Sequence, residues 1–557
     1  MYILGISAMS HDSAAALLDD AGIVAAIEEG KLARTRTIGG IPRAAIQFCL
    51  ERAGISWSDV AHIAVASQPS GPLPRPARKV SGRRGRESHD VAALRHLVGG
   101  GADRVKTLDH HLCHAASAFY PSGFQQALIV SLDRQGDGRT GLVALGESSG
   151  IRELDSIRFP HSLAWIYSQF TQLLGFRSHG DEHKTQWLSL IGEPEFAAPL
   201  IEMLRQKPNG PPHLNPKYFR RKVDGELCFT KDFYRRIESP APTKQGRTSE
   251  LTDGKRATLA ASLQKAVATV LSDWLAALRT ETKEESLCLA GGLFLNPLLV
   301  REIETNSGFE NVFVQPAAGN EGTALGAAWL VSHEIRKQTY KPLVSSPLWG
   351  PAYSNAQIKL VLDNCKATYR WLDSEDLLLA ETTRLLQLGK IVAFFQGATE
   401  FGPRALGNRS LLASPWAPYV KENLNDFVKH RESFRPFALA IPEHVCAEFF
   451  QASPNARSLT TMAQANETGR KLLHGLPEGF LLPNNLVRLQ VVRESDNPLF
   501  WKLLKRSGEN SPAPILVNTS FNLFGEPLVV TPRDAVRSYF CSGTDALVIG
   551  NFLLGKR

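Results

Sequence analysis

The feature that most constrains the fold is a repeated alternation of short apolar runs with amphipathic stretches. Runs such as Tyr2–Ser7 and Leu128–Leu132 are bounded by glycine, aspartate or serine, which is typical of strands. Stretches with apolar residues at helical spacing, such as Ala44–Ala53, lie between them. This alternation predicts an α/β architecture. We expect further strands at Ala14–Leu18, Ile23–Ile27, Val60–Ala66, Gly141–Leu145, Ser286–Ala290 and Val312–Val314, and further helices at Pro297–Thr305 and Gly322–Val331.

The length of the chain predicts more than one domain. A chain of 557 residues exceeds what one hydrophobic core usually organises. The α/β pattern lapses between Pro342 and Asn355 into proline, serine, glycine and tyrosine, so we expect two domains, 1–345 and 346–557. No apolar run approaches the ~20 residues of a membrane span. The first residues lack the layout of a signal peptide, and a cytoplasmic location is expected.

Charge and cysteine usage exclude several classes of protein. The net charge is +8, and much of the excess lies at residues 72–86, where no aromatic side chain could stack on bases. A second basic stretch, Lys217–Lys222, contains Tyr218 and Phe219. We interpret the first stretch as a solvated loop and do not expect nucleic acid as a partner. The seven cysteines are scattered and form no CxxC pair, which argues against disulfides and a thiolate zinc site.

Three segments near the C-terminus combine cations, small polar residues and turn formers. They are Phe401–Ser410, Lys429–Phe437 and Asn518–Asn522. Arginine binds phosphate or carboxylate oxygens bidentately, and lysine, serine and asparagine add further donors. The segments therefore predict a site for a phosphate-bearing small molecule, with the alternative that nearby carboxylates pair with some cations on a solvated face. The cations are Arg404, Arg409, Lys429, Arg431 and Arg435, and the carboxylates are Glu400, Glu422, Asp426 and Glu432.

Histidines cluster in the segment Asp109–Ala116, which we predict to be helical. His110 and His114 are four residues apart, so both imidazoles would lie on one face and reach one metal ion. Asp133 follows a predicted strand and offers a carboxylate. Such a donor set suits iron(II), manganese or zinc, and the sequence does not choose among them. The alternative for Asp133 and Asp137 is turn formation without a ligand.

Glycine-rich segments and one more histidine add candidates. Gly291 and Gly292 follow a predicted strand, and Gly319–Thr323 precedes a predicted helix, where free backbone N–H groups attract phosphate. His11 lies at a bend between two strands, where it could act as a base near neutral pH or cap the turn.

The order of these segments resembles the NodU/CmcH family of O-carbamoyltransferases over nearly the whole chain. The sequence departs from the family pattern at four places: Asn320 replaces an aspartate, Arg134 replaces a common glycine, Glu182–Ser189 replaces Glu-Tyr-Lys-Val-Met-Gly-Leu-Ala, and Leu482 and Asn484 replace a histidine and an aspartate before Arg488. The matching motifs are His11–Ala15, Glu28–Arg34, His110–Ala115, Pro160–Leu163, Leu287–Gly292, Pro316–Gly319 and the three C-terminal segments.

The resemblance implies a fold and a reaction for each domain. Residues 1–345 would adopt the actin-like ATPase (ASKHA) fold of the enzymes that synthesise threonylcarbamoyl-adenosine, and residues 346–557 a YrdC-like fold. The second domain would convert carbamoyl phosphate and ATP, with Mg²⁺, to carbamoyl adenylate. The first would hold a divalent metal, in this family most often Fe²⁺, and pass the carbamoyl group to a hydroxyl of a small molecule.

The resemblance also assigns roles to individual residues. The metal ligands would be His110, His114, Asp133 and Asn320, and the catalytic residues His11, Arg404 and Lys429. The residues that bind substrate or cofactor would be Asp12, Ser13, Gly291, Gly292, Arg404, Lys429, Arg431, Arg435, Arg488, Asn518 and Ser520.

Two other functions remain open at this stage. The acceptor could be a macromolecule, either tRNA or a protein thiol in hydrogenase maturation. The chain could also be a degenerate ASKHA protein that binds ATP without transferring a group. We expect the acceptor to be recognised by segments 67–90 and 201–244, but no motif in them identifies it, and the oligomeric state is not predicted.

Overall fold

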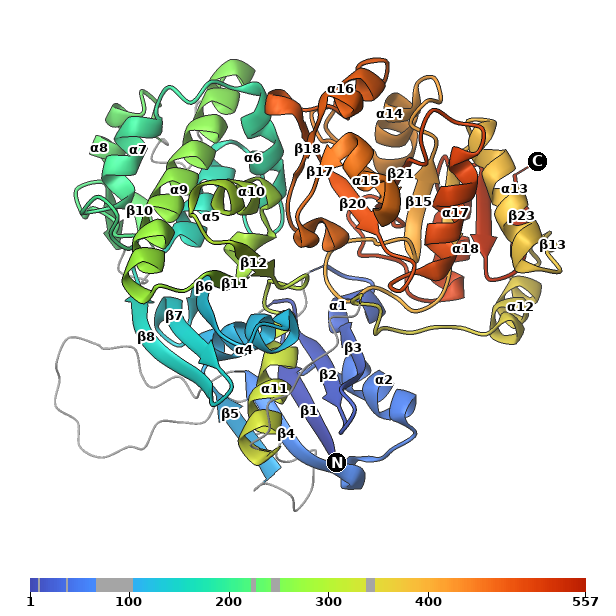
Figure 1. The fold of residues 1–557 in the computed structure, drawn as a ribbon, viewed down its shortest axis with the longest axis horizontal. Helices are drawn as coiled ribbons and strands as arrows, with labels where there is room; N and C mark the ends of the chain where they lie inside the picture. The colour runs from blue at the N-terminus through green and yellow to red at the C-terminus, as the bar shows by residue number, and fades with distance from the viewer. Residues whose placement is uncertain are drawn as a thin grey trace.

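The computed structural model shows two lobes (Figure 1). We call residues 1–336 the N-lobe and residues 346–556 the C-lobe. The basic segment 72–86 and the whole predicted acceptor segment 67–90 lie outside the described residues, as does the beginning, 342–345, of the predicted domain boundary. The described residues are 1–8, 11–36, 39–66, 104–221, 227–241, 251–336 and 346–556.

The N-lobe contains two five-stranded sheets with the same topology. Their orders are β3-β2-β1-β4-β5 and β8-β7-β6-β11-β12. In each sheet three consecutive strands pair antiparallel, and two later strands add parallel to the first. This repetition within one lobe is the duplicated architecture expected of an actin-like ATPase fold. The strands are β1 (Tyr2–Ser7), β2 (Ala14–Leu18), β3 (Ile23–Glu28), β4 (Val60–Ala66), β5 (Val105–Leu108), β6 (Ala127–Gly136), β7 (Arg139–Glu147), β8 (Gly150–Arg158), β11 (Ser286–Ala290) and β12 (Asn311–Val314).

Two helices cross between these sheets and pack against each other. Helix α4 (His110–Ser122) follows β5 but packs on β6, β7 and β11, whereas α11 (Gly322–Arg336) follows β12 but packs on β1, β2 and β4 (Figure 1). The contact is close because of glycine: a Cβ at Gly326 would lie 1.7 Å from the Cys113 carbonyl oxygen. The predicted helix at Gly322–Val331 is therefore confirmed and extends to Arg336.

Helices cover the outer face of the second sheet around a large apolar core. The longest, α9, spans Asp253–Thr282 and is capped by the Thr252 side chain. The predicted acceptor segment 201–244 contains regular elements in its described part. The remaining N-lobe elements are α1 (Glu29–Leu32), α2 (Arg43–Ala53), α5 (Leu163–Leu173), α6 (Glu182–Leu188), α7 (Ala197–Leu204), β9 (Phe219–Arg221), β10 (Leu227–Phe229), α8 (Lys231–Arg236) and α10 (Pro297–Asn306).

The C-lobe is built on one eight-stranded mixed sheet, in the order β13-β23-β22-β14-β15-β21-β16-β20. Its faces alternate along each strand: Val392 and Phe394 of β14 pack in one core, whereas Ala393 and Phe395 pack in the other. This lobe thus agrees with the predicted α/β class. Its strands are β13 (Arg370–Trp371), β14 (Val392–Phe395), β15 (Arg409–Ala413), β16 (Ala438–Pro442), β20 (Leu489–Val492), β21 (Leu516–Ser520), β22 (Ala546–Ile549) and β23 (Phe552–Gly555).

Helices and a small sheet complete the C-lobe. Helices α13 and α17 cover one face of the large sheet, and α12 and α18 cover the other. These elements are α12 (Asn355–Asn364), α13 (Glu375–Gln387), α14 (Val420–Glu422), α15 (Glu443–Phe449), β17 (Phe450–Gln451), β18 (Ala463–Ala465), α16 (Glu467–His474), β19 (Leu486–Val487), α17 (Pro498–Gly508) and α18 (Pro532–Phe540).

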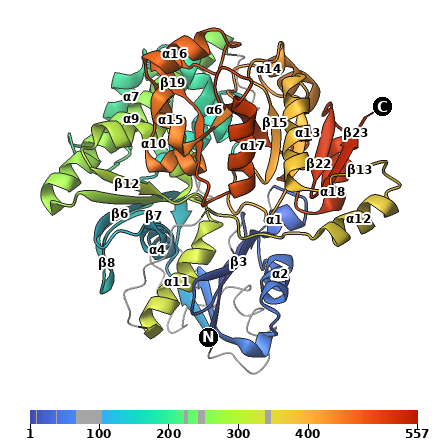
Figure 2. The same cartoon turned by 45° about the vertical axis from the view of Figure 1, so that its right-hand side comes forward.

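Charged side chains join the two lobes at several places, among them α1 and α10. On α1, which lies against the C-lobe in both views (Figures 1 and 2), the buried Lys31 ammonium donates to the carbonyl oxygens of Glu400 and Gly402, at 2.6 and 2.7 Å. On α10, the Glu304 carboxylate accepts hydrogen bonds from three C-lobe side chains. These come from Ser453 Oγ at 2.6 Å, Asn455 Nδ2 at 2.8 Å and Thr461 Oγ1 at 2.6 Å.

Candidate functional site

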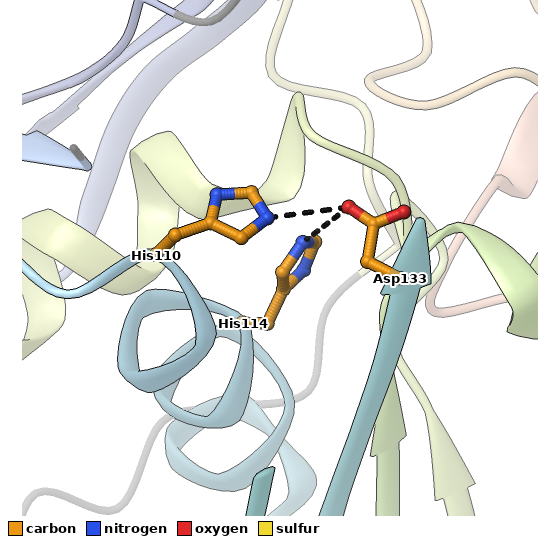
Figure 3. Close-up of side chains that lie close together, drawn as sticks. All are labelled: His110, His114 and Asp133. Carbon is orange, nitrogen blue, oxygen red and sulfur yellow. Dashed lines mark hydrogen bonds and ion pairs between the residues drawn. The ribbon is translucent and has the colours of Figure 1, made fainter. Parts of the chain in front are cut away.

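Three of the four predicted metal ligands, His110, His114 and Asp133, converge at the start of α4 (Figure 3). His110 Nε2 lies 3.2 Å and His114 Nε2 lies 3.4 Å from the same oxygen of Asp133, which follows the apolar part of β6. Both imidazoles are fully buried. Their ligand atoms and a carboxylate oxygen of Asp133 lie within 4.8 Å of one another. Helix and strand thus bring Asp133 to two histidines that lie 19 and 23 positions before it in the sequence.

Neighbouring residues fix the position of His110. The Asp109 side chain caps α4 by accepting from Leu112 N, and Asp137 accepts from the His110 backbone N–H at 2.8 Å. Gly136 leaves room for the imidazole, because a Cβ there would lie 2.0 Å from its Cδ2 atom. Asp137 therefore stabilises the start of α4 through its side chain. This agrees with the alternative interpretation, in which Asp137 is a turn residue and not a metal ligand.

The electrostatics of this cluster suit a cation. Burial lowers the pKa of His114, so its imidazole is neutral and can act as a ligand. Although burial acts in the opposite direction, hydrogen bonds from both histidines hold the pKa of Asp133 well below its usual range. The Nδ1 atoms of His110 and His114 have no hydrogen-bond partner among the described residues. The imidazoles of His110 and His114 and the Asp133 carboxylate therefore offer donors that fit a divalent metal such as iron(II), manganese or zinc.

The glycine pair lies directly beside Asp133. Gly291 has φ +102°, and a Cβ there would lie 2.1 Å from the Leu132 carbonyl oxygen. A Cβ at Gly292 would lie 3.0 Å from Asp133 Oδ1. Glycine lets the backbone approach Leu132 and the Asp133 carboxylate this closely. The role of Gly291 and Gly292 in binding substrate or cofactor stays a prediction.

His11 and Asn320 form a second polar group in the N-lobe. His11 Nδ1 lies 2.8 Å from Asp12 Oδ2 and 3.2 Å from Asn320 Nδ2, and the hydrogen bond to Asp12 raises the His11 pKa. The Asn320 carbonyl oxygen is buried and has no partner among the described residues. The backbone carbonyl oxygen of Ser13, the residue just before β2, accepts a hydrogen bond from the Glu29 N–H at 2.9 Å. Asn320 as a metal ligand stays a prediction.

Sequence reasoning gave no role to Glu321, which is buried next to Asn320. Burial and the nearby carboxylates of Asp12 and Glu28 raise the pKa of Glu321 to about 8. The sequence around Glu321 gave no indication of a raised pKa. The shift depends on Asp12, which lies just before β2, and on Glu28 of β3, and only the fold brings these carboxylates close.

In the C-lobe, a carboxylate shapes the loop that presents Arg404. One oxygen of the fully buried Glu400 accepts from the backbone N–H groups of Leu406, Asn408 and Arg409, at 2.8, 3.0 and 3.0 Å. The Arg404 guanidinium donates to the N-lobe carbonyl oxygen of Leu295 at 2.9 Å. The alternative that Glu400 pairs with cations on a solvated face is therefore wrong.

Arg404 belongs to a cluster of cations that have few counter-ions. Burial lowers its pKa to about 10, and Arg435 contributes to the shift. Burial and neighbouring arginines, which repel further positive charge, also lower the pKa of Arg488, Arg431 and Lys429 well below the usual range. Lys429 is buried and the four arginines are partly buried. So many partly desolvated cations in one place are costly without an anion. We call Arg404, Lys429, Arg431, Arg435 and Arg488 the cation cluster.

The third C-terminal segment contacts this cluster. Lys429 donates to Asn522 Oδ1 at 2.7 Å and to Ser520 through both its hydroxyl and its carbonyl oxygen. The Asn518 side-chain amide donates to Gln490 Oε1 at 2.6 Å, and the Oδ1 atom of the same amide is buried without a partner among the described residues. The three segments predicted to form one anion site therefore do come together.

Arg409, which the sequence placed among the anion-binding cations, has another role. Its fully buried guanidinium donates to the carbonyl oxygens of Pro351 and Gly397, at 3.0 and 3.2 Å, and stacks on Phe395. These contacts occupy the side chain in holding loops together. The expectation that Arg409 faces a ligand is wrong, because it lies on β15 with its side chain in the interior.

The N-lobe supplies further residues to the cation cluster, and these were missed. On α6, Lys184 pairs with Glu432 at 2.8 Å, and Trp187 lies under the guanidinium of Arg488, 5.3 Å from its ring centroid. His183 lies beside them. A match to the family pattern alone could have drawn attention to this segment, but only the fold shows that it reaches the C-lobe.

A buried metal-type donor set and a cation cluster within one α/β chain are typical of an enzyme that transfers a phosphate-activated group. Two family models match the chain: the one described as carbamoyltransferase N-terminus matches residues 2–71 and 91–329, and the one described as carbamoyltransferase C-terminus matches residues 383–556. The chain belongs to the carbamoyltransferase family. It is therefore an enzyme of the carbamoyltransferase class.

Individual relatives agree with this assignment. Nodulation protein NolNO of Sinorhizobium fredii is 32% identical, and the alignment covers 98% of this chain and 79% of NolNO. The 3'-hydroxymethylcephem-O-carbamoyltransferase of Amycolatopsis lactamdurans is 31% identical over 44% of each chain. Among solved structures, full-length HypF in the phosphate- and nucleotide-bound form is 14% identical, with a TM-score of 0.33 over 60% of this chain and 56% of that chain. That score is too low to carry an argument.

The lengths and compositions of the helices show whether any of them could span a membrane. None of the helices in the described ranges combines the length and the apolar composition needed to cross a bilayer.

Proposed function

We propose that the protein is an ATP-dependent O-carbamoyltransferase whose acceptor is a hydroxyl group of a small molecule. Carbamoyl phosphate, ATP and water would give carbamoyl adenylate, pyrophosphate and phosphate. The acceptor hydroxyl would then displace AMP and leave as a carbamate ester. The cofactors would be Mg²⁺ with ATP and a divalent metal, iron(II), in the N-lobe.

The observation that carries this proposal is the cation cluster. Five cationic side chains meet there, and Glu432, which pairs with Lys184, lies 3.8 Å from Arg435. Guanidinium groups bind phosphate oxygens bidentately, and here they would be desolvated before the ligand arrives. A substrate with several phosphate charges would offset the mutual repulsion that lowers the pKa of these side chains.

Loops connect the two parts of the site and favour a division of labour between them. Gly402, two residues before Arg404, donates its N–H to Glu28 at 2.7 Å and lies against Pro316, whose carbonyl oxygen would be 3.2 Å from an added Cβ. Gly291 in turn donates to the Ala318 carbonyl oxygen at 2.8 Å. We propose that residues 346–557 activate the carbamoyl group and that residues 1–345 transfer it. A mixed anhydride made between the lobes would be used before water reaches it.

His110, His114 and Asp133 would hold the metal, with the Asn320 amide oxygen as a further ligand. When bound, the metal would supply a positive charge that polarises an oxygen of the reacting group. Nucleotide binding and proton transfer would be carried out by residues of the chain itself. Gly292 would offer its backbone N–H group to the nucleotide, whereas the Gly291 N–H already donates to the Ala318 carbonyl oxygen. Asp12 orients the His11 imidazole, which would receive the proton of the acceptor hydroxyl.

The test is a product analysis. Purified protein is incubated with carbamoyl phosphate, ATP and Mg²⁺, with and without iron(II), and pyrophosphate and carbamoyl adenylate are measured by mass spectrometry. We expect both products from wild type and neither from Arg404→Ala. Arg384→Ala, at an exposed arginine of the same lobe that pairs with Glu381, is the matched control and should keep the activity. Absence of adenylate from wild type under every metal condition would overturn the proposal.

A further inference from the structure

Helix α6 forms a wall of the cation cluster although it belongs to the N-lobe. Its residue Lys184 pairs with Glu432, between the cationic residues Arg431 and Arg435. One turn further, Trp187 is buried with Leu298, Met462 and Leu482, so apolar residues of both lobes hold the helix in place. The position of α6 is therefore fixed by contacts on both sides of the ion pair.

His183 lies between Glu182 and Lys184 on this helix, and the surrounding charges are mainly cationic. The charges that act most strongly on its imidazole are those of Arg435, Arg404, Arg36 and Lys184. They come from two C-lobe segments, from the turn after α1 and from α6 itself. Together with burial, they hold the pKa of His183 well below its usual value.

The charged groups of α6 have partners, whereas the His183 ring has none among the residues that the structure describes. The Glu182 carboxylate accepts from Ser168 Oγ at 2.7 Å and from the His179 N–H at 2.8 Å. Lys184 is neutralised by Glu432 at 2.8 Å and Asp181 at 3.3 Å. Within the described ranges, no hydrogen bond or ion pair joins the ring nitrogens of His183 to another residue. A half-buried polar ring next to cations thus keeps its donor and acceptor capacity for something else.

We propose that His183 is a binding residue for the phosphate-bearing substrate and takes up a proton when that substrate binds. The N-lobe would in this way supply a conditional positive charge next to the cation cluster, whose five members belong to the C-lobe. This inference rests on the proposed function, because it requires that the cation cluster binds phosphate groups.

The sign of the coupling follows from the charges. In the empty site the imidazole is neutral, because a further positive charge would be repelled by Arg404, Arg435, Arg36 and Lys184. A polyphosphate brings negative charge among the same groups and raises the pKa of His183 in the complex. Between the two pKa values binding takes up a proton, so affinity is highest at the acid end of this window and falls as pH rises through it.

A bland alternative is that His183 only fills space on α6. In that case its protonation would not change on binding. Other groups whose pKa is lowered, above all Lys429, could also take up protons when the ligand binds. Pyrophosphate itself titrates near neutral pH. The experiment must therefore measure the difference that His183 alone makes.

We would titrate the full-length protein with pyrophosphate by calorimetry, between pH 6 and 8, in buffers of different ionisation enthalpy, which gives the number of protons exchanged. Wild type is compared with His183→Gln and His183→Asn. The control is His444→Gln, at an exposed histidine of α15 that stacks near Trp501. We expect wild type and control to take up about one proton more than the His183 variants, and their affinity to fall up to about tenfold more per pH unit.

The outcomes are separable. Equal proton uptake by wild type and both His183 variants would overturn this inference and leave the anion site intact. Failure of wild type to bind pyrophosphate at any pH would overturn the anion site, and the inference with it. Folding of the variants is checked by the unchanged stoichiometry of binding at the acid end of the range.

Discussion

The contact between α10 and the C-lobe allows one prediction to be worked out in detail. Glu304 accepts hydrogen bonds from Ser453, Asn455 and Thr461. Glu304→Ala removes all three, but the consequences differ. The fully buried Thr461 hydroxyl loses its side-chain acceptor, Asn455 keeps a second acceptor in the Val312 carbonyl oxygen at 2.8 Å, and Ser453 can turn to water.

These differences give the expected cost. An unsatisfied buried donor costs about 2 kcal/mol, and the two bonds that water or another acceptor replaces cost about 0.5 kcal/mol each. Separation of the lobes at α10 should therefore become easier by about 3 kcal/mol. Because each 1.4 kcal/mol corresponds to a factor of ten, opening should become roughly a hundredfold more frequent.

Hydrogen exchange at β12 measures this opening. The Val314 N–H donates to the Asn455 side chain at 3.0 Å, so this amide is freed when the lobes part there. We expect exchange at Val314 to accelerate roughly a hundredfold in Glu304→Ala. Glu302→Ala is the matched control, because Glu302 accepts only from Asn306 of its own helix among the described residues. Equal exchange rates in the two variants would refute the reasoning.

Three further predictions concern buried or metal-binding side chains. His114→Ala should lose stoichiometric metal after loading with iron(II), measured by elemental analysis, because it removes one of two imidazole ligands; retained metal would contradict the site. Lys31→Met should lower the free energy of unfolding by about 3 kcal/mol, since it strands buried acceptors, whereas exposed Lys390→Met should leave the urea midpoint unchanged. Arg409→Lys should cost about 2 kcal/mol, because lysine cannot reach several carbonyls at once, and unchanged stability relative to Arg384→Lys would contradict its structural role.

Much of the fold could be predicted because its strands are short apolar runs with clear boundaries. The meander of β1–β3 and the helix beginning at His110 follow directly from periodicity and capping. Arg404, Lys429 and Asn518 could be assigned to one site because their types and turn-rich context point to one ligand. Arg409 shows the limit: an arginine in the same segment faces inward, and only the register of β15 decides that.

The residues missed share a physical reason. His183, Trp187 and Arg36 lie far from the C-terminal segments in sequence, and nothing local marks them as cation-cluster neighbours. Glu321 carries a raised pKa because the fold buries it and places the carboxylates of Asp12 and Glu28 nearby. Long-range electrostatics of this kind depend on which lobe faces which, and that arrangement cannot be derived from local pattern.

The crossing of α4 and α11 has a consequence for how such a chain could arise. The unit that ends with α4 supplies both imidazoles of the metal site, and the unit that begins with β6 supplies Asp133. A gene encoding a single unit would assemble this site only where two copies of its product meet. Duplication and fusion turn that intermolecular junction into one polypeptide, after which each half is free to diverge.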